Sequence, residues 1–281
     1  MSDRRGEFMS NALVKFGLVL AVAAFIAGPL PLAVSCALAE EVNEELDKRA
    51  GEFKDQVAAA DLQLLITGAQ GLAQAVQTRD LAATRKAWLE THAIWMRCEA
   101  FTADLFPGLE TKINATDNPK TGFHVIEKSL FAPQPTVNMA IVQQLIDDLQ
   151  IYQHVFGQAK WTGYYLLASS STYTFEMGDI AGDGGESPVS GSSIADLQHG
   201  LDGVERVWKF MFADPVRAKD HFKAEEIDDQ IAALHGLLGV SALDQIPEGI
   251  FTRETTRLAA EIADLGPMFG WRKPNYTDIG E

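Results

Sequence analysis

Residues 80–106 read DLAATRKAWLETHAIWMRCEAFTADLF, and this stretch decides the fold class. Asp80 stands immediately before a run whose apolar residues recur at helical spacing, which is typical of an N-cap. The pattern predicts a helix from Asp80 to about Phe106. Its length and period belong to a helix that packs against others, so the segment favours a helical bundle over a sheet.

One face of this predicted helix combines apolar and ionisable side chains. At steps of four, three, four and seven residues it carries Trp88, His92, Trp95, Glu99 and Phe106. A buried, unpaired carboxylate costs several kcal/mol, so Glu99 needs a cation. That cation is either an Arg or Lys from another helix or a metal ion, and the segment alone leaves both open. Cys98 is interpreted as a small core residue.

The flanking sequence extends the helical pattern in both directions. Further helices are expected over 41–77, from near Thr121 to before Pro133, and over 137–157, 216–238 and 252–264. Ser193 and Asp196 resemble a cap pair that opens a helix to about Phe212, which Asp214-Pro215 should end. The stretches 107–121 and 178–193 are predicted loops, and 161–175 is left unassigned. No segment alternates as a strand does, so we predict an all-α fold of four-helix-bundle-like halves within one domain, 40–281.

The first 39 residues have the pattern of a secretory signal peptide. Arg4, Arg5 and Lys15 precede the uncharged stretch 16–34, and Ala37-Leu38-Ala39 provides a small-x-small cleavage site. This pattern predicts that the chain is exported. The alternatives are an uncleaved membrane anchor and a lipoprotein acylated at Cys36.

Composition excludes several classes of function. The chain carries 23 Lys+Arg against 39 Asp+Glu, a net charge of −16, which argues against a nucleic-acid partner. Removing residues 1–39 takes away three basic and two acidic residues, so the mature chain is near −17. Cleavage also leaves Cys98 as the single cysteine, which excludes an internal disulfide and a thiolate-rich metal site.

A second motif lies in Gly122-Phe-His124-Val-Ile-Glu127. His124 and Glu127 are three residues apart, which on a helix places both side chains on one face, close enough to share an ion. Imidazole with carboxylate suits iron, zinc, manganese or copper(II). Zinc peptidases of the HExxH or HxxEH type need a second histidine on the same turn, and Lys128 stands in its place, so hydrolysis is disfavoured.

This motif resembles the GxHxxE signature of the imelysin/peptidase M75 family. Around it, Arg97-Cys-Glu99 with Asp104-Leu-Phe106, and Asp196-Leu-Gln198 with Asp202-Gly203, are similar to stretches of the family's EfeO/EfeM branch. The resemblance covers about residues 45–270. It implies an all-helical, metal-binding component of an EfeO-type iron-uptake system in the periplasm or at the cell surface of a Gram-negative bacterium. Such a component would work with an inner-membrane iron permease or another transporter.

The resemblance also implies a ligand set and a second possible function. His124 and Glu127 would be the metal pair, with Glu99 as the third ligand and Asp196 as a weaker fourth, and the ion would be iron, or else zinc or copper. A cell-surface alginate-binding protein belongs to the same branch, so an anionic polysaccharide is the alternative ligand. The chain's negative charge opposes such a glycan, which would need a bridging cation or a basic patch, with candidates Arg97, Lys112, Lys120 and Lys128.

The acidic loop Glu176…Asp179…Asp183-Gly-Gly-Glu186 does not match a calcium-binding loop. Ala181 occupies an expected ligand position, and Ser190 replaces the closing Glu. We therefore interpret it as a solvated loop that is able to donate one carboxylate to a cleft between the bundle halves.

Overall fold

The computed structural model describes residues 43–103, 105–114 and 120–277, and the predicted signal peptide lies outside these ranges. The described chain begins with one long helical run. It consists of α1 (Glu44–Phe53), a π-helical turn (Lys54–Ala58) and α2 (Ala59–Thr78). Arg79 then adopts a left-handed conformation, φ 57°, which ends α2 and reverses the chain. The predicted cap follows directly, because Asp80 Oδ1 accepts a hydrogen bond from Ala83 N at 3.0 Å.

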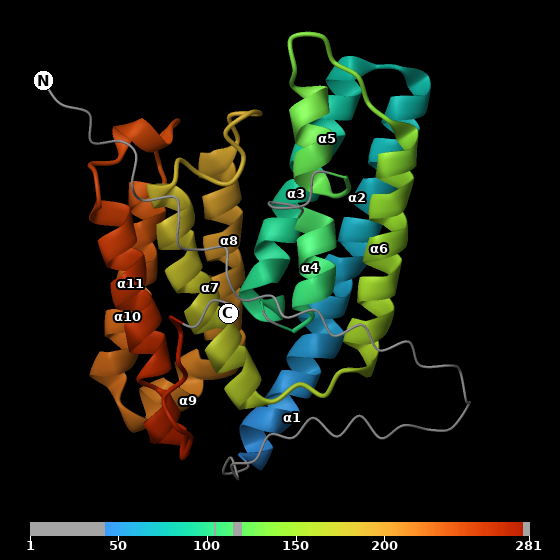
Figure 1. The fold of residues 1–281 in the computed structure, drawn as a ribbon. Helices are drawn as coiled ribbons and strands as arrows, with labels where there is room; N and C mark the ends of the chain where they lie inside the picture. Colours follow the sequence, from blue (N-terminus) through green and yellow to red (C-terminus); the bar gives the residue numbers. More distant parts are fainter. Residues whose placement is uncertain (1–42, 104, 115–119, 278–281) are drawn as a thin grey trace, which may run out of the picture. The chain divides into compact units, whose positions relative to one another are not determined.

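The first bundle is built on α3 (Leu81–Thr102), α2 and α6 (Met139–Gln158). Its fourth position is shared by two short helices, α4 (Pro107–Asn114) and α5 (Phe123–Leu130), as Figure 1 shows. The prediction of a loop over 107–121 was therefore wrong for α4. Pro107 is the first helical residue, where a missing N–H costs nothing, and Glu110 lies in the first turn, where the helix dipole favours an acid.

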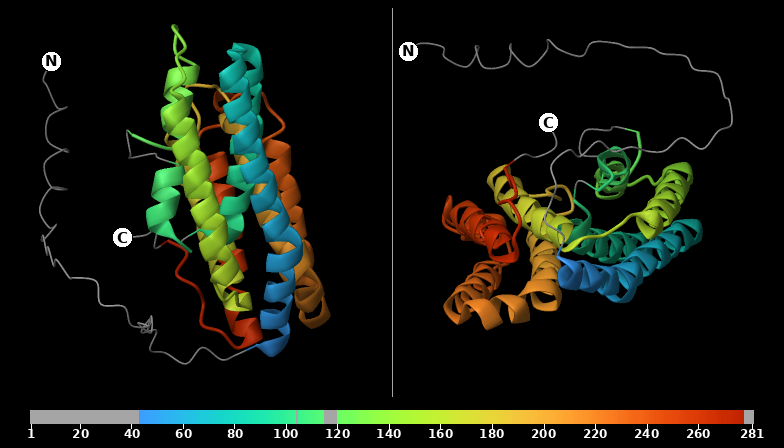
Figure 2. Two further views of the ribbon diagram at one scale, coloured as in Figure 1. Left: turned by 90° about the vertical axis from the view of Figure 1, so that its right-hand side faces the viewer. Right: turned by 90° about the horizontal axis from the view of Figure 1, so that it is seen from below.

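The second bundle contains α7 (Gly163–Gly182), α8 (Ser193–Val207), α10 (His221–Leu237) and α11 (Ile250–Ala263). Seen end-on in the right panel of Figure 2, the helices of residues 193–263 gather on one side and those of residues 59–158 on the other. Helix α7 includes the stretch that the sequence left unassigned. Some of its hydroxyls donate to carbonyls one turn earlier, as Ser170 Oγ does to Leu166 O at 2.8 Å, and others donate to neighbouring helices, as Ser171 Oγ does to Ala259 O at 3.1 Å, so they do not compete with the helix.

The prediction that Asp214-Pro215 ends the helix begun at residue 193 was wrong. Helix α8 continues through a π-helical turn (Trp208–Phe212) into α9 (Ala213–Lys219). Pro215 is in the first turn of α9, where the absence of its N–H is tolerated. Two 3-10 turns, Leu243–Gln245 and Gly266–Phe269, flank α11. No strand occurs in the described ranges, so the all-α prediction is confirmed there, and none of these helices is long and apolar enough to cross a membrane.

The two bundles meet where α3 packs against α8. Gly203 allows this approach, because a Cβ there would lie 2.3 Å from the carbonyl oxygen of Arg97. An ion-pair cluster spans the same junction: buried Asp61 of α2 accepts from Arg97 Nη2 of α3 and Arg206 Nη1 of α8, both at 2.7 Å. Arg97 is thereby committed to Asp61, which removes it from the predicted basic patch.

Replacement of Gly203 by alanine should destabilise the protein. The new methyl group meets backbone atoms of α3 that cannot move independently, and overpacking of this kind costs about 1–3 kcal/mol. Gly71→Ala on α2 is the matched control: no atom lies within 4 Å of its Cβ position, so it should stabilise by about 0.5–1 kcal/mol. Urea unfolding measures both values, and equal effects would contradict the close approach of α3 and α8.

Candidate metal centre

Helix α5 begins at the residue pattern that the sequence singled out. Gly122 is the N-cap with φ 90°, a left-handed conformation that favours glycine, and the helix starts at Phe123. The indole nitrogen of Trp88 donates to Phe123 O at 3.1 Å and so ties this start to α3. His124 and Glu127 are 3% and 1% exposed, and His124 Nδ1 lies 3.1 Å from Glu127 Oε2. The predicted shared face is therefore present, and it faces the interior.

The loop between α7 and α8 supplies a second acid to His124. Glu186 Oε1 lies 2.8 Å from His124 Nε2, and the Glu186 side chain is 7% exposed. Gly185 precedes it with φ 94°, and a Cβ there would meet the Ser193 side chain at 2.4 Å. This glycine turns the loop inward, so the loop does donate one carboxylate, and the donor is Glu186.

His92 of α3 is a candidate ligand that the sequence analysis did not name as one. It is fully buried, stacks on Trp88 with ring centroids 4.8 Å apart, and lies edge-on to His124 at 5.4 Å. Its Nδ1 is 3.0 Å from Asp196 Oδ1, while Nε2 has no hydrogen-bond partner among the described residues. Its place beside Glu99 in the aromatic stripe was the available signal.

Asp196 and Glu127 play the same part for the two imidazoles. In each carboxylate, one oxygen lies within hydrogen-bonding distance of a histidine Nδ1, and the other accepts a hydrogen bond from the loop before α8. Glu127 Oε1 accepts from the backbone N–H of Ser190 at 2.8 Å, and Asp196 Oδ2 accepts from Ser192 Oγ at 3.1 Å. A carboxylate on the far nitrogen fixes a metal-binding imidazole in orientation and tautomer, which is the arrangement seen here twice.

The predicted cap pair of Ser193 and Asp196 is not formed. Ser192 is the N-cap, and Ser193 Oγ accepts from the backbone N–H of Ser187 at 3.1 Å. Ser193 therefore closes the loop on itself and helps to hold Glu186 in position. The sequence placed the start of the helix within one residue but gave its hydroxyl the wrong partner.

Glu99 is linked to Glu186 through the side chain of Asn114. Asn114 Nδ2 donates to Glu186 Oε1 at 2.8 Å and reaches Glu99 Oε1 at 3.4 Å. Burial, together with the negative charges of Glu186, Glu176 and Glu110, raises the pKa of Glu99 well above its ordinary value. Glu99 therefore keeps its proton to a higher pH than an ordinary glutamate does.

Charge within the group is divided between the imidazoles and the acids. Burial alone would lower the pKa of His124, but the hydrogen bonds and charges of Glu127 and Glu186 outweigh burial and raise it to about 9. Burial would likewise raise the pKa values of Glu127, Glu186 and Asp196, yet each is lowered. His124 causes the change for the first two, and His92 for Asp196. A proton on His124 thus occupies the place where a metal ion would supply positive charge.

The donor atoms of three residues converge. One ligand atom each from His92, His124 and Glu186 lie within 4.8 Å of one another. The set joins α3, α5 and the loop before α8, so both bundles contribute to it. Two nitrogens and one oxygen suit a borderline or hard transition-metal ion.

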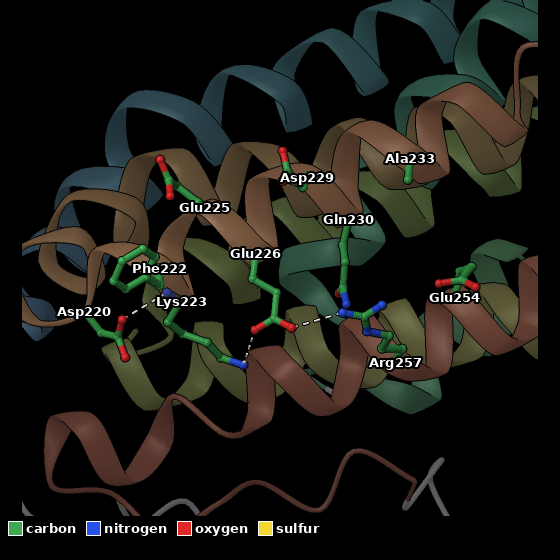
Figure 3. A pocket seen from close by; sticks show the side chains of 10 residues that line it. All are labelled: Asp220, Phe222, Lys223, Glu225, Glu226, Asp229, Gln230, Ala233, Glu254 and Arg257. Atoms are coloured by element: carbon green, nitrogen blue, oxygen red, sulfur yellow. Dashed lines mark hydrogen bonds and ion pairs between the residues drawn. The ribbon is translucent and has the colours of Figure 1, made fainter.

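A groove of about 680 Å³ between α10 and α11 has different chemistry (Figure 3). Its lining includes five acids, and its two bases are already paired: Lys223 Nζ and Arg257 Nη2 lie 3.4 and 3.0 Å from the two carboxylate oxygens of Glu226. The network ties α10 to α11. It offers no unpaired base to an anionic polysaccharide.

The comparisons with known proteins agree with this architecture. The family model of imelysin, peptidase M75, matches residues 52–265. A solved structure from Parabacteroides distasonis, described as an iron-regulated protein A precursor, superposes with a TM-score of 0.61 at 13% sequence identity, covering 80% of this chain and 94% of that one. No curated protein sequence is significantly similar. Since the family model spans most of the described helices, the chain belongs to the imelysin family.

Proposed function

We propose that this protein binds one transition-metal ion, iron foremost, through His92, His124 and Glu186. The observation that carries the proposal is the convergence of these three donors around two imidazoles whose outer nitrogens are already held by buried carboxylates. His92 Nε2 is buried without a hydrogen-bond partner among the described residues, and a bound ion would satisfy it by coordination. Glu99 is linked to this group through Asn114, which donates to Glu186 and to Glu99, and we keep it as a candidate for a further ligand.

The proposed roles differ from those that the family motif implied. His124 keeps its role as a ligand. Glu127 and Asp196 become supporting carboxylates, because both oxygens of each are engaged by a histidine and the loop. Buried Cys98 takes no part, since burial raises the pKa of its thiol well above the ordinary value.

The choice of iron rests on the family and the donor chemistry. Nitrogen and oxygen ligands without thiolate suit iron, zinc and copper(II) alike. The structural neighbour is described as iron-regulated, and the EfeO/EfeM branch resembled by the sequence serves iron uptake. Together with the signal-peptide pattern of residues 1–39, this supports an exported iron-binding component of a Gram-negative bacterium that passes its ion to an inner-membrane permease or another transporter.

The alternative function, binding of alginate or another anionic polysaccharide, has one supporting observation. Three protein donors leave coordination positions open, and a uronate carboxylate is able to fill one of them. Lys112 and Lys128, on the neighbouring helices α4 and α5, are exposed. In this proposal the metal ion bridges the protein and the sugar.

Substitution of the two histidines should abolish tight metal binding. In anaerobic titrations with Fe²⁺, His92→Ala and His124→Ala should each lose more affinity than Glu127→Gln and Asp196→Asn, for which a roughly 10–100-fold loss is expected. His154→Ala, on the exposed face of α6, is the matched control and should bind as the wild type does. Unchanged affinity in both histidine variants would refute the site, and a Glu127→Gln loss as large as that of His124→Ala would make Glu127 a direct ligand.

The metal-free protein should lose stability as the pH rises from neutral to alkaline. The folded pKa of His124 is about 9, against an ordinary value of 6.5, so its contribution is complete below pH 6.5 and disappears as the pH passes 9. The amount is of the order of 3 kcal/mol, from 1.36 kcal/mol per pKa unit. Urea unfolding after treatment with a chelator measures it: the stability advantage of the wild type over His124→Gln should shrink between pH 6 and pH 10. A constant difference would contradict the buried imidazolium.

Retention of alginate should depend on the metal ion. The metal-loaded protein should bind immobilised alginate, and a chelator or the His124→Ala change should release it, because the ion supplies the positive charge that the chain lacks. Affinity chromatography with and without chelator measures this. Retention that survives the chelator would show that the ion is no bridge, and absence of retention in both conditions would remove the alternative.

A further inference from the structure

A second group of metal-ligating side chains lies on the side of α8 that packs against α10. His199, Asp202 and Glu205 follow one another at steps of three along α8, and His235 of α10 completes the group. The ligand atoms of Asp202, Glu205 and His235 lie within 4.8 Å of one another. None of these residues belongs to the centre formed by His92, His124 and Glu186.

Two pairs within this group are separated by distances that suit ligands of one ion, and His199 joins the three converging residues through Asp202. His199 Nδ1 lies 3.5 Å from Asp202 Oδ2, and His235 Nε2 lies 3.5 Å from Glu205 Oε2. Neither nitrogen has a hydrogen-bond partner among the described residues, although both atoms are shielded from solvent. Two ligands that each bond a tetrahedral zinc ion at about 2.0–2.1 Å are separated by roughly 3.3 Å.

A simple histidine–carboxylate pair in the same chain has a different geometry. On α10, His221 Nε2 and Glu225 Oε1 approach to 3.0 Å, an ordinary hydrogen-bonding distance, and both side chains are more than half exposed. The pairs at α8 and α10 are longer and less exposed, and they converge from two helices. They therefore have the arrangement of donors around a cation rather than of two surface ion pairs.

Charge and access both permit an ion to bind there. The four side chains are between 28% and 43% exposed. Glu205 Oε1 is paired with Lys209 Nζ, which leaves Oε2 for His235. Arg206, the next base on α8, is committed to Asp61. No positive side chain thus lies between the two histidines and the two acids among the described contacts.

We propose that His199, Asp202, Glu205 and His235 form a second site, for a divalent ion of borderline softness such as Zn²⁺. Two imidazoles and two carboxylates suit such an ion. Asp196 and Asp202 are six residues apart, about 9 Å along the helix, so α8 serves both centres from different faces. Because its ligands come from α8 and α10, the ion would join these two helices and stabilise the folded second bundle.

Zinc binding by the mature chain tests this site separately from the first. Equilibrium dialysis at micromolar Zn²⁺, followed by metal analysis, should find two bound ions in the wild type and one in His92→Ala/His124→Ala. Adding His199→Ala and His235→Ala should remove the remaining ion. Zinc should also raise the Tm of the His92→Ala/His124→Ala protein, and it should no longer do so once His199 and His235 are replaced.

His221→Ala is the matched control, because it removes a histidine paired with a carboxylate on the same helix, and it should leave zinc stoichiometry unchanged. A folded His92→Ala/His124→Ala protein that retains no zinc would overturn the second site. So would undiminished zinc after replacement of His199 and His235. Should the core histidine variants fail to fold, His235→Ala in the otherwise unchanged chain decides: loss of one ion supports the site, and no loss refutes it.

Discussion

The contact between α3 and α8 is the constraint on which the candidate metal centre depends. It brings His92 of one bundle against Asp196 of the other, and it is possible because Gly203 has no side chain where α8 crosses the backbone of α3. The same junction buries Asp61 between two arginines, so the helices are held by paired charges as well as by apolar packing. Removing one partner from such a buried cluster costs far more than the cluster itself contributes. The paired charges therefore hold α3 against α8, and the hydrogen bond to Asp196 orients the imidazole of His92.

The centre itself follows a simple division of labour. In the proposed site, acids on the outside orient the two imidazoles, and the inner nitrogens and Glu186 would bind the ion. Without an ion, the raised pKa values of His124 and Glu99 favour protons on both groups, and these protons offset the surplus of carboxylates. An ion that binds replaces these protons, which links metal affinity to pH. The acidic surface of the chain adds a general attraction for cations.

The sequence predicted the fold class and most helices because caps and apolar periodicity are local signals. Asp80 is the clearest case, since its side chain acts within four residues of its position. Helix α4 was missed because a helix of eight residues is too short to show a clear apolar periodicity. Helix α7 was missed because segments rich in Ser and Thr occur in helices as well as in loops. In the site, the shared face of His124 and Glu127 follows from spacing alone, whereas the pairing of His92 with Asp196 joins residues 104 positions apart. Only the crossing of α3 over α8 creates that pair, and nothing local in the sequence specifies a crossing.

The loop that precedes α8 has one more consequence. It holds Glu186 against His124, and through Ser190 and Ser192 it also braces Glu127 and Asp196. In the proposed site, a displacement of this segment would remove a direct ligand of the ion and the supports of both imidazoles together. At that site, this one segment would therefore control both the binding and the release of the ion.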